Sequence, residues 1–432
     1  MPLVGTSQGF VLPEGQKSQK IRFEFLNNLI IVPLKINGAE LSFVLDTGVS
    51  KPILFNLSDQ DSLQINEVSE ITIRGLGDGE PMKALSSKHN NFELGNATNF
   101  DQELYVVLDK DINFSASLGV PVHGILGYDL FRDFIVELNY SSQILKLHDP
   151  DTYVYKGDKK SETLPMEIIN RKAYVSGVVL TEESKDIPVR LLVDTGSSDA
   201  LWLFHDPDKG LDIPKRHYED YLGKGLSGDI FGKRTKVNGI KIGSFSLKDA
   251  KAAFPYKESF GLIKNLGDRN GSVGGEILKR FNIIFDYPNQ KVTIKKNGNF
   301  KQPFQYNWAG IELQHSGVRY IAERIADSQG IVRRSDDENF GNVQILLQNR
   351  TRLSLVPEII VSSIRSGSPA EEAGLQEGDV ILAVNGKRVH KYKLQEILKM
   401  LNDNDKEGKR IRVLIERYNK DLLFSFVLKK MF

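Results

Sequence analysis

The chain has 432 residues, a formal net charge of +1, 40% hydrophobic residues and 26% charged residues, an ordinary composition for a globular protein. The near-zero charge argues against a nucleic-acid partner, because such proteins carry a basic excess, and no apolar run reaches the ~18 residues that span a bilayer. The absence of cysteine excludes disulfides, thiolate metal sites and a cysteine nucleophile.

The length predicts about three domains. We expect a polar, irregular N-terminal extension over residues 1–20, a first lobe (lobe 1) over 21–152, a second lobe (lobe 2) over 153–298, and a further domain over 299–432. The extension has no apolar segment of the kind that a signal peptide needs, so the sequence leaves the cellular compartment unknown. A signal peptide already removed would place the protein in the periplasm or at the cell surface.

Lobe 1 begins with strand patterns that lead into an Asp-Thr-Gly triplet. Apolar segments at 21–25 and 29–36 predict two strands. Asn37-Gly38 predicts a hairpin turn between strands, because both residue types readily accept positive φ. The returning strand, 41–45, ends at the triplet 46–48. We therefore expect Asp46 on a tight turn at the end of a buried strand.

A glycine-rich hairpin and a short apolar segment follow. The polar stretch 58–70 predicts a loop or a weak helix, and the segments on either side of Gly75–Gly79 predict the arms of a hairpin with a glycine-rich tip. Further on, 124–127 reads Gly-Ile-Leu-Gly, and we expect a short helix over 128–133 and a strand over 134–140.

The same series of patterns recurs in lobe 2. A strand over 189–193 ends at a second Asp-Thr-Gly, 194–196, so the two Asp residues lie 148 positions apart (194 minus 46). The glycine cluster Gly223–Gly228 begins 148 positions after Gly75, and Gly271–Gly274 begins 147 positions after Gly124. We interpret this as an internal duplication of a unit of roughly 140 residues, mainly β, with a second short helix over 276–281.

The C-terminal region has a different, mixed pattern. Ser368 to Glu371 form a helix-capping box with proline at the first helical position, and Gly374 is placed to end that helix. The remaining expectations are strands at 379–384, 410–417 and 421–429, a turn at Asn385-Gly386, and a helix over 391–401 with apolar residues at helical spacing. The acidic run 335–339 predicts that part of the segment 314–357 is a mobile inserted loop.

The duplicated unit resembles one lobe of an aspartic peptidase, and its short length resembles the subunit of the retroviral (retropepsin-like) enzymes. The resemblance covers about 21–297. It implies a pseudo-two-fold β protein in which Asp46 and Asp194 form the catalytic pair, with no cofactor and no metal, and one chain supplies both lobes so that no oligomer is required. The seven histidines show no metal-ligand spacing.

The resemblance also implies roles for residues around the pair. The hydroxyls of Thr47 and Thr195 would cross-link the two turns, and Ser197 would hydrogen-bond Asp194, whereas lobe 1 has Val49 at the matching position. The hairpins would be mobile flaps over an extended substrate. Neither tip carries the tyrosine of pepsin-type enzymes, although Tyr221 lies near the second. The implied support residues and flap glycines are Thr47, Gly48, Thr195, Gly196, Ser197, Gly75, Gly77, Gly79, Gly223, Gly225 and Gly228.

Residues 360–432 resemble a PDZ domain through Ser-Pro-Ala-Glu-Glu-Ala-Gly-Leu, Glu-Gly-Asp-Val-Ile and Val-Asn-Gly. The resemblance implies a groove for a C-terminal peptide between the strand 309–313 and the helix 391–401, lined by Gly310, Ile311, Leu394 and Leu398. The whole chain thus resembles bacterial aspartic peptidases that carry a PDZ domain. The expected function is an aspartic endopeptidase. The alternative is a non-catalytic peptide-binding or scaffold protein with a degenerate peptidase fold, in which the two Asp residues only stabilise turns.

Overall fold

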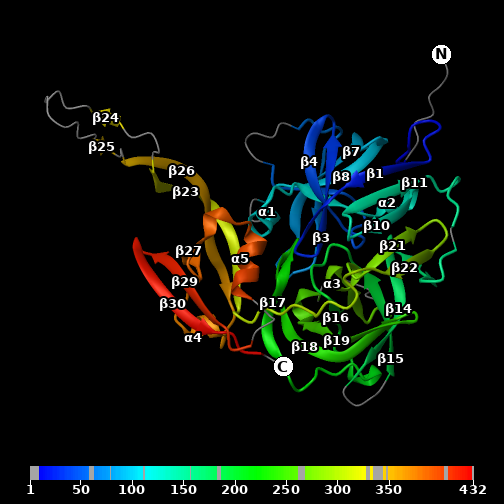
Figure 1. Ribbon diagram of the computed structural model, residues 1–432. Coiled ribbons are helices and arrows are strands. Elements are labelled where there is room, and N and C mark those ends of the chain that lie inside the picture. The colour runs from blue at the N-terminus through cyan, green and yellow to red at the C-terminus, as the bar shows by residue number, and fades with distance from the viewer. Residues whose placement is uncertain are drawn as a thin grey trace. The chain divides into compact units, whose positions relative to one another are not determined.

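The computed structural model describes residues 9–57, 63–77, 79–109, 112–155, 157–181, 186–260, 268–326, 331–333, 344–346, 349–402 and 407–430. The chain divides into two compact units (Figure 1). The first comprises 1–307 with 430–432, and the second comprises 308–429. The acidic run 335–339 lies outside the described residues, as do 58–62 of the segment expected to be a loop or weak helix.

Lobe 1 is built on one mixed sheet (Figure 1). Among the described residues its strands lie in the spatial order β2 (Glu24–Leu26), β3 (Leu29–Ile36), β4 (Ala39–Leu45), β9 (Gly124–Leu126), β5 (Ile53–Leu54), β8 (Ala97–Val107), β7 (Met82–Leu94) and β6 (Ser69–Ile73). The hairpin turn between β3 and β4 has positive φ at Asn37 (47°) and Gly38 (89°), as the sequence predicts.

Lobe 2 repeats this sheet strand for strand. Its described strands lie in the order β13 (Glu167–Ile169), β14 (Lys172–Leu180), β15 (Asp186–Val193), β20 (Gly271–Val273), β16 (Leu201–Leu203), β19 (Phe245–Pro255), β18 (Gly228–Ile242) and β17 (Tyr218–Gly225). The extra β3–β7 pairing of lobe 1 also recurs, as β14–β18. The internal duplication therefore holds at the level of sheet topology.

A third sheet of the first unit joins the two lobes. Its described strands are β1 (Ser18–Arg22), β11 (Ile144–His148), β10 (Ile135–Asn139), β21 (Phe281–Asp286), β22 (Lys291–Lys296) and β12 (Ser161–Pro165). Strands β10 and β21 pair in antiparallel fashion at its centre, with Ile135 opposite Asp286. The N-terminal extension is less irregular than expected, because residues 18–20 belong to β1 and Phe10 is buried, with its amide bonded to Asp133.

Short helices follow the Gly-bounded strands. In lobe 1, α2 (Tyr128–Asp133) has the predicted bounds, and in lobe 2, α3 (Gly275–Leu278) is shorter than predicted. The unit also contains α1 (Phe114–Leu118) and the 3₁₀ turns η1 (Pro207–Lys209) and η2 (Lys257–Ser259). Among the described residues, no helix is both long and apolar enough to cross a membrane.

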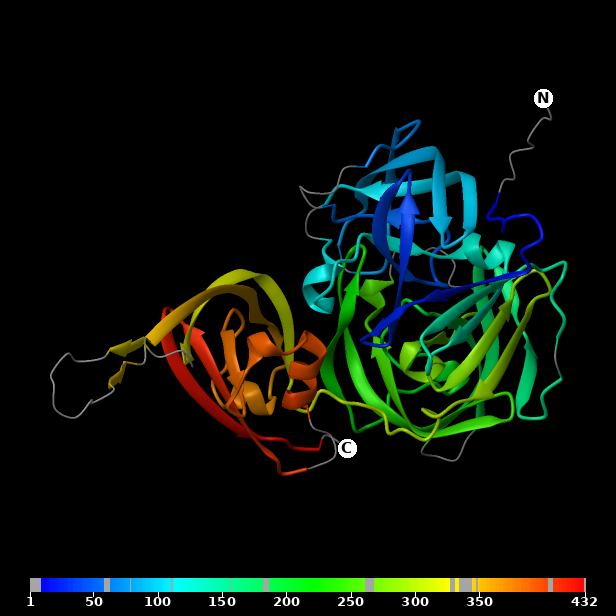
Figure 2. The same cartoon turned by 45° about the horizontal axis from the view of Figure 1, so that its top comes forward.

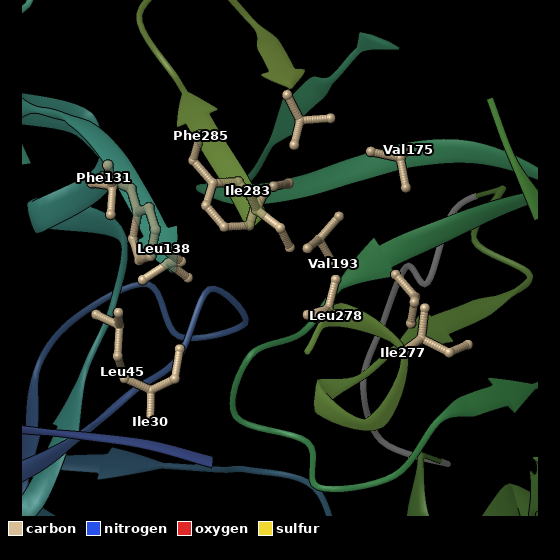
Figure 3. Packing of buried hydrophobic residues seen from close by; sticks show 14 of the residues in the cluster. Ile30, Leu45, Phe131, Leu138, Val175, Val193, Ile277, Leu278, Ile283 and Phe285 are labelled. Atoms are coloured by element: carbon tan, nitrogen blue, oxygen red, sulfur yellow. The ribbon is translucent and has the colours of Figure 1, made fainter. Parts of the chain in front are cut away.

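One hydrophobic core runs through both lobes and the joining sheet. Leu45 and Val193, which immediately precede the two Asp residues, both belong to it (Figure 3). Figure 3 also shows Leu138 and Ile283, from the central strands β10 and β21, in the same cluster. Burial of these side chains stabilises the strand ends that carry both triplets.

Residues 300–306 pack on lobe 2 through their aromatic side chains, Phe300, Phe304 and Tyr306. The Arg280 guanidinium lies 4.0 Å from the ring centroid of Phe304 and donates hydrogen bonds to the carbonyls of Phe300 and Pro303. Phe304 is buried in the main core. A cation stacked on an aromatic ring and bonded to several carbonyls fixes the segment to the first unit.

The second unit is an α+β domain. Its described strands are β23 (Ile311–Ala326), β26 (Asn349–Ile364), β27 (Val380–Val384), β28 (Lys387–Arg388), β29 (Arg410–Arg417), β30 (Lys420–Val427) and the separate pair β24 (Ile331–Arg333) and β25 (Gln344–Leu346). Its helices are α4 (Pro369–Glu372), α5 (Leu394–Leu401) and the 3₁₀ turn η3 (Val389–Lys391). Figure 2 shows β23 and β26 side by side as a pair of long strands. Both ends of the segment 314–357, which was expected to include an inserted loop, therefore lie in strands.

Local signals in this unit largely match the expectations. The Ser368 side chain caps α4 by accepting a hydrogen bond from the Glu371 amide, and Asn385 and Gly386 have φ of 51° and 80°. The helix predicted over 391–401 begins later, at Leu394, because residues 389–391 form η3 instead.

Candidate active site

The two Asp-Thr-Gly triplets are held by equivalent backbone bonds. The Asp46 amide donates to the carbonyl of Leu126 at 2.8 Å, and the Asp194 amide donates to that of Val273 at 3.0 Å. The acceptors end β9 and β20, which lie parallel to β4 and β15. Each Gly-bounded segment therefore fixes the start of one triplet, which explains why the two motifs recur together in the sequence.

The two threonines cross-link the lobes through buried hydrogen bonds. Thr47 Oγ1 donates to the carbonyl of Val193 at 2.6 Å and accepts from the Thr195 amide at 3.1 Å. Thr195 Oγ1 donates to the carbonyl of Leu45 at 2.8 Å and accepts from the Thr47 amide at 3.0 Å. Both side chains are almost fully buried. The two turns are therefore fixed against each other by four bonds related by the pseudo-two-fold.

The glycine of each triplet lets the two carboxyl groups approach. Gly48 and Gly196 donate their amides to Oδ1 of Asp46 and Asp194, at 2.6 and 3.1 Å. A Cβ on Gly196 would lie 2.2 Å from Cγ of Asp46, an approach that no side chain tolerates. A Cβ on Gly48 would lie 3.0 Å from Oδ1 of Asp46 and 3.5 Å from Oδ1 of Asp194, so the structure brings the two carboxyl groups together.

Burial and mutual repulsion make both carboxyl groups hard to ionise. Burial raises the pKa of Asp46, and the charge of Asp194 raises it further. Burial also raises the pKa of Asp194, although the positive charges of Arg269 and Lys172 oppose this. Two carboxyl groups that lie close together retain a shared proton more readily than isolated ones and titrate as a pair.

Ser197 supports Asp194 through its main chain. Its amide hydrogen-bonds Asp194, which helps to stabilise the ionised form, and its carbonyl accepts the Gly275 amide at 2.7 Å. The resemblance led us to expect such a bond to Asp194 in lobe 2. In lobe 1, the Val49 amide contacts the main-chain carbonyl of Asp46 at 3.3 Å.

A buried ionic network behind the second triplet was not anticipated from the sequence. Asp199 accepts hydrogen bonds from both Arg234 and the Trp202 indole, at 2.8 and 2.9 Å, and pairs with Lys251 at 3.2 Å. Burial alone would raise the pKa of Asp199, but the charges of Arg234 and Lys251 hold it well below its usual range. The network anchors the chain just after the triplet 194–196.

The tips of the two glycine hairpins are bonded to each other. Ser227 lies between the glycines of the second tip. Its Oγ accepts a hydrogen bond from the Gly75 amide at 2.9 Å, and its carbonyl accepts one from the Gly79 amide at 2.6 Å. Its own amide donates to the carbonyl of Leu76 at 2.9 Å. A Cβ on Gly225 would lie 2.0 Å from the Leu76 oxygen. The glycines therefore permit close backbone contact between the tips.

Each tip also places a leucine on the opposite lobe. Leu226 packs against an apolar cluster of lobe 1 that includes Val44 and Ile125 and that Val49, next to the first triplet, also contacts. Leu76 packs against a cluster of lobe 2 formed by Trp202, Leu222, Ile230, Ala253 and Phe260. The hairpins thus meet tip to tip, and the tip of the second shares its apolar cluster with Val49, next to the first triplet. Tyr221 lies back from the tip, in contact with Phe231.

The residues expected to line the PDZ groove are only partly gathered there. Gly310 has φ of +74° and its carbonyl accepts the Arg365 amide at 2.9 Å. Ile311 begins β23, which is an edge strand among the described residues of its sheet. On α5, Leu398 is half-buried, whereas Leu394 is almost fully buried and so belongs mainly to the core of the unit.

Two protein-family models match segments of the chain. The aspartyl protease family model matches residues 32–130 and 180–269, one segment in each lobe, and the PDZ domain model matches residues 360–417. The chain therefore has two segments that are similar to aspartyl proteases and a C-terminal segment that is similar to PDZ domains. An aspartic proteinase from Irpex lacteus has a crystal structure that is similar to this chain at a TM-score of 0.41 and 13% sequence identity, covering 66% of this chain and 99% of that one. Among curated proteins, none matches the sequence.

Proposed function

We propose that the protein is an aspartic endopeptidase, with Asp46 and Asp194 as its catalytic pair and two retropepsin-like lobes in one chain. The observation that carries the proposal is the close approach of the two carboxyl groups, held by the reciprocal bonds of Thr47 and Thr195. Turn stabilisation alone does not require two buried carboxyl groups to meet, because their proximity costs free energy whenever both are ionised.

A pair that shares one proton can carry out both proton transfers of peptide hydrolysis. The ionised carboxylate takes a proton from a water molecule as its oxygen attacks the peptide carbonyl carbon, and the protonated carboxyl donates to the carbonyl oxygen. Breakdown of this tetrahedral species cleaves the C–N bond, and the amine leaves with a proton from the pair. The proton belongs to the pair as a unit, so we assign it to neither residue at the start.

The hairpins 75–79 and 223–228 would act as flaps in this mechanism. An extended substrate must displace the bonds between Ser227 and the first tip, after which the freed amides and carbonyls can bind substrate backbone. Closure of the tips would then exclude bulk water from the reacting bond.

A cleavage assay tests the proposal most directly. Casein and a pooled peptide library, incubated with the protein, should yield internal cleavage products. The alternative, a non-catalytic binding or scaffold protein, predicts capture of the same peptides without cleavage. Activity that is lost in EDTA and restored by a divalent metal would point to a metallopeptidase and contradict the proposed pair.

The pH dependence provides a further prediction. Burial, followed by the charge of Asp194, raises the pKa of Asp46 to about 7. Since hydrolysis needs one shared proton, kcat/KM should follow a bell whose acid limb reports protonation of both carboxyl groups. The alkaline limb should lie near pH 7, where the last shared proton is lost. A rate that is constant from pH 4 to 9 would contradict a carboxyl pair as the acid–base machinery.

We further propose that the PDZ domain binds an extended peptide and so selects substrates or partners. PDZ domains add a peptide as a strand beside an exposed sheet edge, and β23 offers such an edge next to the loop at Gly310, among the described residues. A C-terminal carboxylate is the group that this loop would accept. The binding site would involve Gly310, the main chain of Ile311 and the side chain of Leu398, whereas the side chains of Ile311 and Leu394 are buried in the core.

Removal of residues 308–432 should separate this role from catalysis. The main core includes residues of the first unit up to Phe304, so we expect the 1–307 fragment to fold and to cleave short peptides within about threefold of the full chain. Turnover of protein substrates should fall more strongly. As a matched control, a 1–299 fragment should be less stable than 1–307, because it loses the contacts of Arg280 with 300–304. Unfolding of both fragments, seen by circular dichroism, would show that the second unit is needed for stability.

A further inference from the structure

The two halves of the candidate site differ in charge at equivalent positions of the duplicated lobes. In lobe 1, the β3–β4 ladder pairs Ile31 with Val44, so two residues further on Leu29 lies opposite Asp46. In lobe 2, the β14–β15 ladder pairs Tyr174 with Leu192, so two residues further on Lys172 lies opposite Asp194. When the register of each strand pair is continued to the Asp, the opposite residue is therefore apolar in lobe 1 and cationic in lobe 2.

A second pair of equivalent positions, Val122 and Arg269, shows the same change from an apolar residue in lobe 1 to a cationic one in lobe 2. The neighbouring residues show that the two positions are equivalent. His123 bonds both the amide and the carbonyl of Ser42 in lobe 1. Asn270 bonds both the amide and the carbonyl of Arg190 in lobe 2. These residues are equivalent in the duplication, and so are the ones before them. Val122 in lobe 1 is fully buried in the apolar cluster against which Leu29 packs, and its lobe 2 counterpart is Arg269.

Arg269 is buried without a full set of partners. Its side chain is 8% exposed, Nε donates to the carbonyl of Gly271 at 2.9 Å, and the guanidinium lies 5.2 Å from the centroid of the Phe204 ring. Its Nη2 is buried with no hydrogen-bond partner among the described residues. Leaving a buried guanidinium donor unsatisfied is costly, which indicates a group that completes the site when it binds.

The surrounding charges favour an anion as that group. Burial lowers the pKa of Lys172 and the charge of Arg269 lowers it further, so these two cations lie close enough to repel each other. The carboxylates that act on Lys172 are those of Asp46 and Asp194. When that pair shares one proton it carries one negative charge against two positive ones. One positive charge therefore remains uncompensated, and an anionic ligand can neutralise it.

We propose that Lys172 and Arg269 form a specificity site that binds a carboxylate of the substrate, carried by a glutamate or aspartate side chain on the lobe 2 side of the scissile bond. The equivalent lobe 1 positions, Leu29 and Val122, are apolar, so the lobe 1 side accepts an apolar side chain instead. The inference rests on the proposed peptidase function and names its substrate class: peptides with an apolar residue on one side of the cleaved bond and an acidic residue on the other.

Three matched peptides test this with the full-length protein. They carry Glu, Gln or Leu at one position beside the scissile bond, have both termini blocked, and are made in two series, one for each side of the bond. In one of the two series, and not in the other, the wild type should cleave the Glu peptide at least about 10 times faster than the Gln peptide. A ratio of this size lies in the range that a charge-assisted hydrogen bond supports. A fourth peptide, with a free C-terminal carboxylate in place of the Glu side chain, shows whether a chain terminus can supply the same group.

The variants separate recognition from an effect on the catalytic pair. Arg269→Gln should lower kcat/KM for the Glu peptide about 10–100-fold more than for the Gln and Leu peptides, mainly through KM. The loss of its charge beside Asp194 should affect all three peptides alike. Arg269→Lys should retain part of the preference. The double variant Lys172→Leu/Arg269→Val carries the residues that lobe 1 already has and should prefer the Leu peptide. Lys248→Gln, at an exposed position of β19, is the control and should behave as wild type.

The outcomes distinguish the inference from the function on which it rests. Equal cleavage of Glu and Gln peptides by the wild type would overturn the specificity site and leave the peptidase intact. An equal loss on all peptides in Arg269→Gln would show that the cations only tune the catalytic pair. If no peptide is cleaved, the proposed function fails. Fluorescence anisotropy then decides the inference separately: the wild type must bind the Glu peptide more tightly than the Gln peptide, and Arg269→Gln must remove the difference.

Discussion

Replacing either Asp46 or Asp194 by asparagine should reduce peptide hydrolysis by at least about 10²–10⁴-fold, the range that general acid–base groups contribute, while leaving the fold intact. Asparagine has nearly the same shape and can still accept the Gly48 or Gly196 amide, but it cannot take a proton from water or return one to the amine. The loss should fall mainly on kcat, because binding of the substrate backbone does not use the proton.

Stability provides the control for this loss. Burial raises the pKa of both carboxyl groups above the ordinary value of 3.8, so the folded protein holds a proton where the unfolded chain has released it. The free energy of unfolding therefore falls as pH rises from 3.8 through the raised folded values. Asparagine carries no charge at any pH, so it removes this loss of stability. Both variants should therefore unfold at the same temperature as wild type, or higher, at pH 8.

Asp208→Asn, at an exposed position of η1, is the matched substitution and should leave activity and stability unchanged. Turnover near the wild-type rate in a well-folded Asp46→Asn or Asp194→Asn protein would contradict the assignment of the pair. The hydrolysis would then come from another site, and the two Asp residues would only stabilise their turns.

The sequence was sufficient to predict the duplication and the triplets, because those features depend on local chemistry. A strand that ends in Asp-Thr-Gly needs a particular tight turn, and that requirement is visible at both 46–48 and 194–196. The hairpin turns at 37–38 and 385–386, the cap at Ser368 and the bounds of α2 were predictable for the same reason. Since each signal lies within a few residues, no tertiary information was needed to find it.

Features that depend on contacts between distant segments could not be predicted in this way. Ser227 bonds a hairpin about 150 residues away in the chain, and nothing local distinguishes it from a turn serine. Residues 18–20 become a strand because β11 offers an edge, and 300–306 are held on lobe 2 by contacts with Arg280. Lys172 and Arg269 stand out only after the two lobes have been aligned by their ladders.

The start of α5 shows how local competition limits such predictions. Apolar spacing over 391–401 is helical, but η3 occupies 389–391, and the Lys393 amide bonds the Glu396 side chain to begin the helix at Leu394. The residues of η3 would also suit an α-helix, so their composition does not distinguish the two structures. Periodicity therefore identified the element, and its first turn was decided by hydrogen bonds that the spacing does not encode.

Replacing Thr47 by valine should lower the free energy of unfolding by about 2–5 kcal/mol, because two buried partners lose their hydrogen bonds at once. These are the Val193 carbonyl and the Thr195 amide, at 2.6 and 3.1 Å from Thr47 Oγ1. Valine fills the same volume, so the loss comes from the unsatisfied groups and not from a cavity. Urea titration followed by circular dichroism measures it.

Thr47→Ser is the matched control, since it keeps the hydroxyl and removes one methyl group, at a cost of about 1 kcal/mol. The pseudo-two-fold provides a second test, because Thr195→Val removes the equivalent bonds to Leu45 and Thr47 and should cost a similar amount. The four bonds are separate, because each hydroxyl bonds main-chain groups only, so the double valine variant should lose about the sum of the two single variants. Activity should fall with stability in both valine variants, because the same bonds hold the turns that bring the carboxyl groups together. If Thr47→Val were as stable as Thr47→Ser, the cross-link would not be what joins the two turns, and the close approach of Asp46 and Asp194 would have to depend on the joining sheet alone.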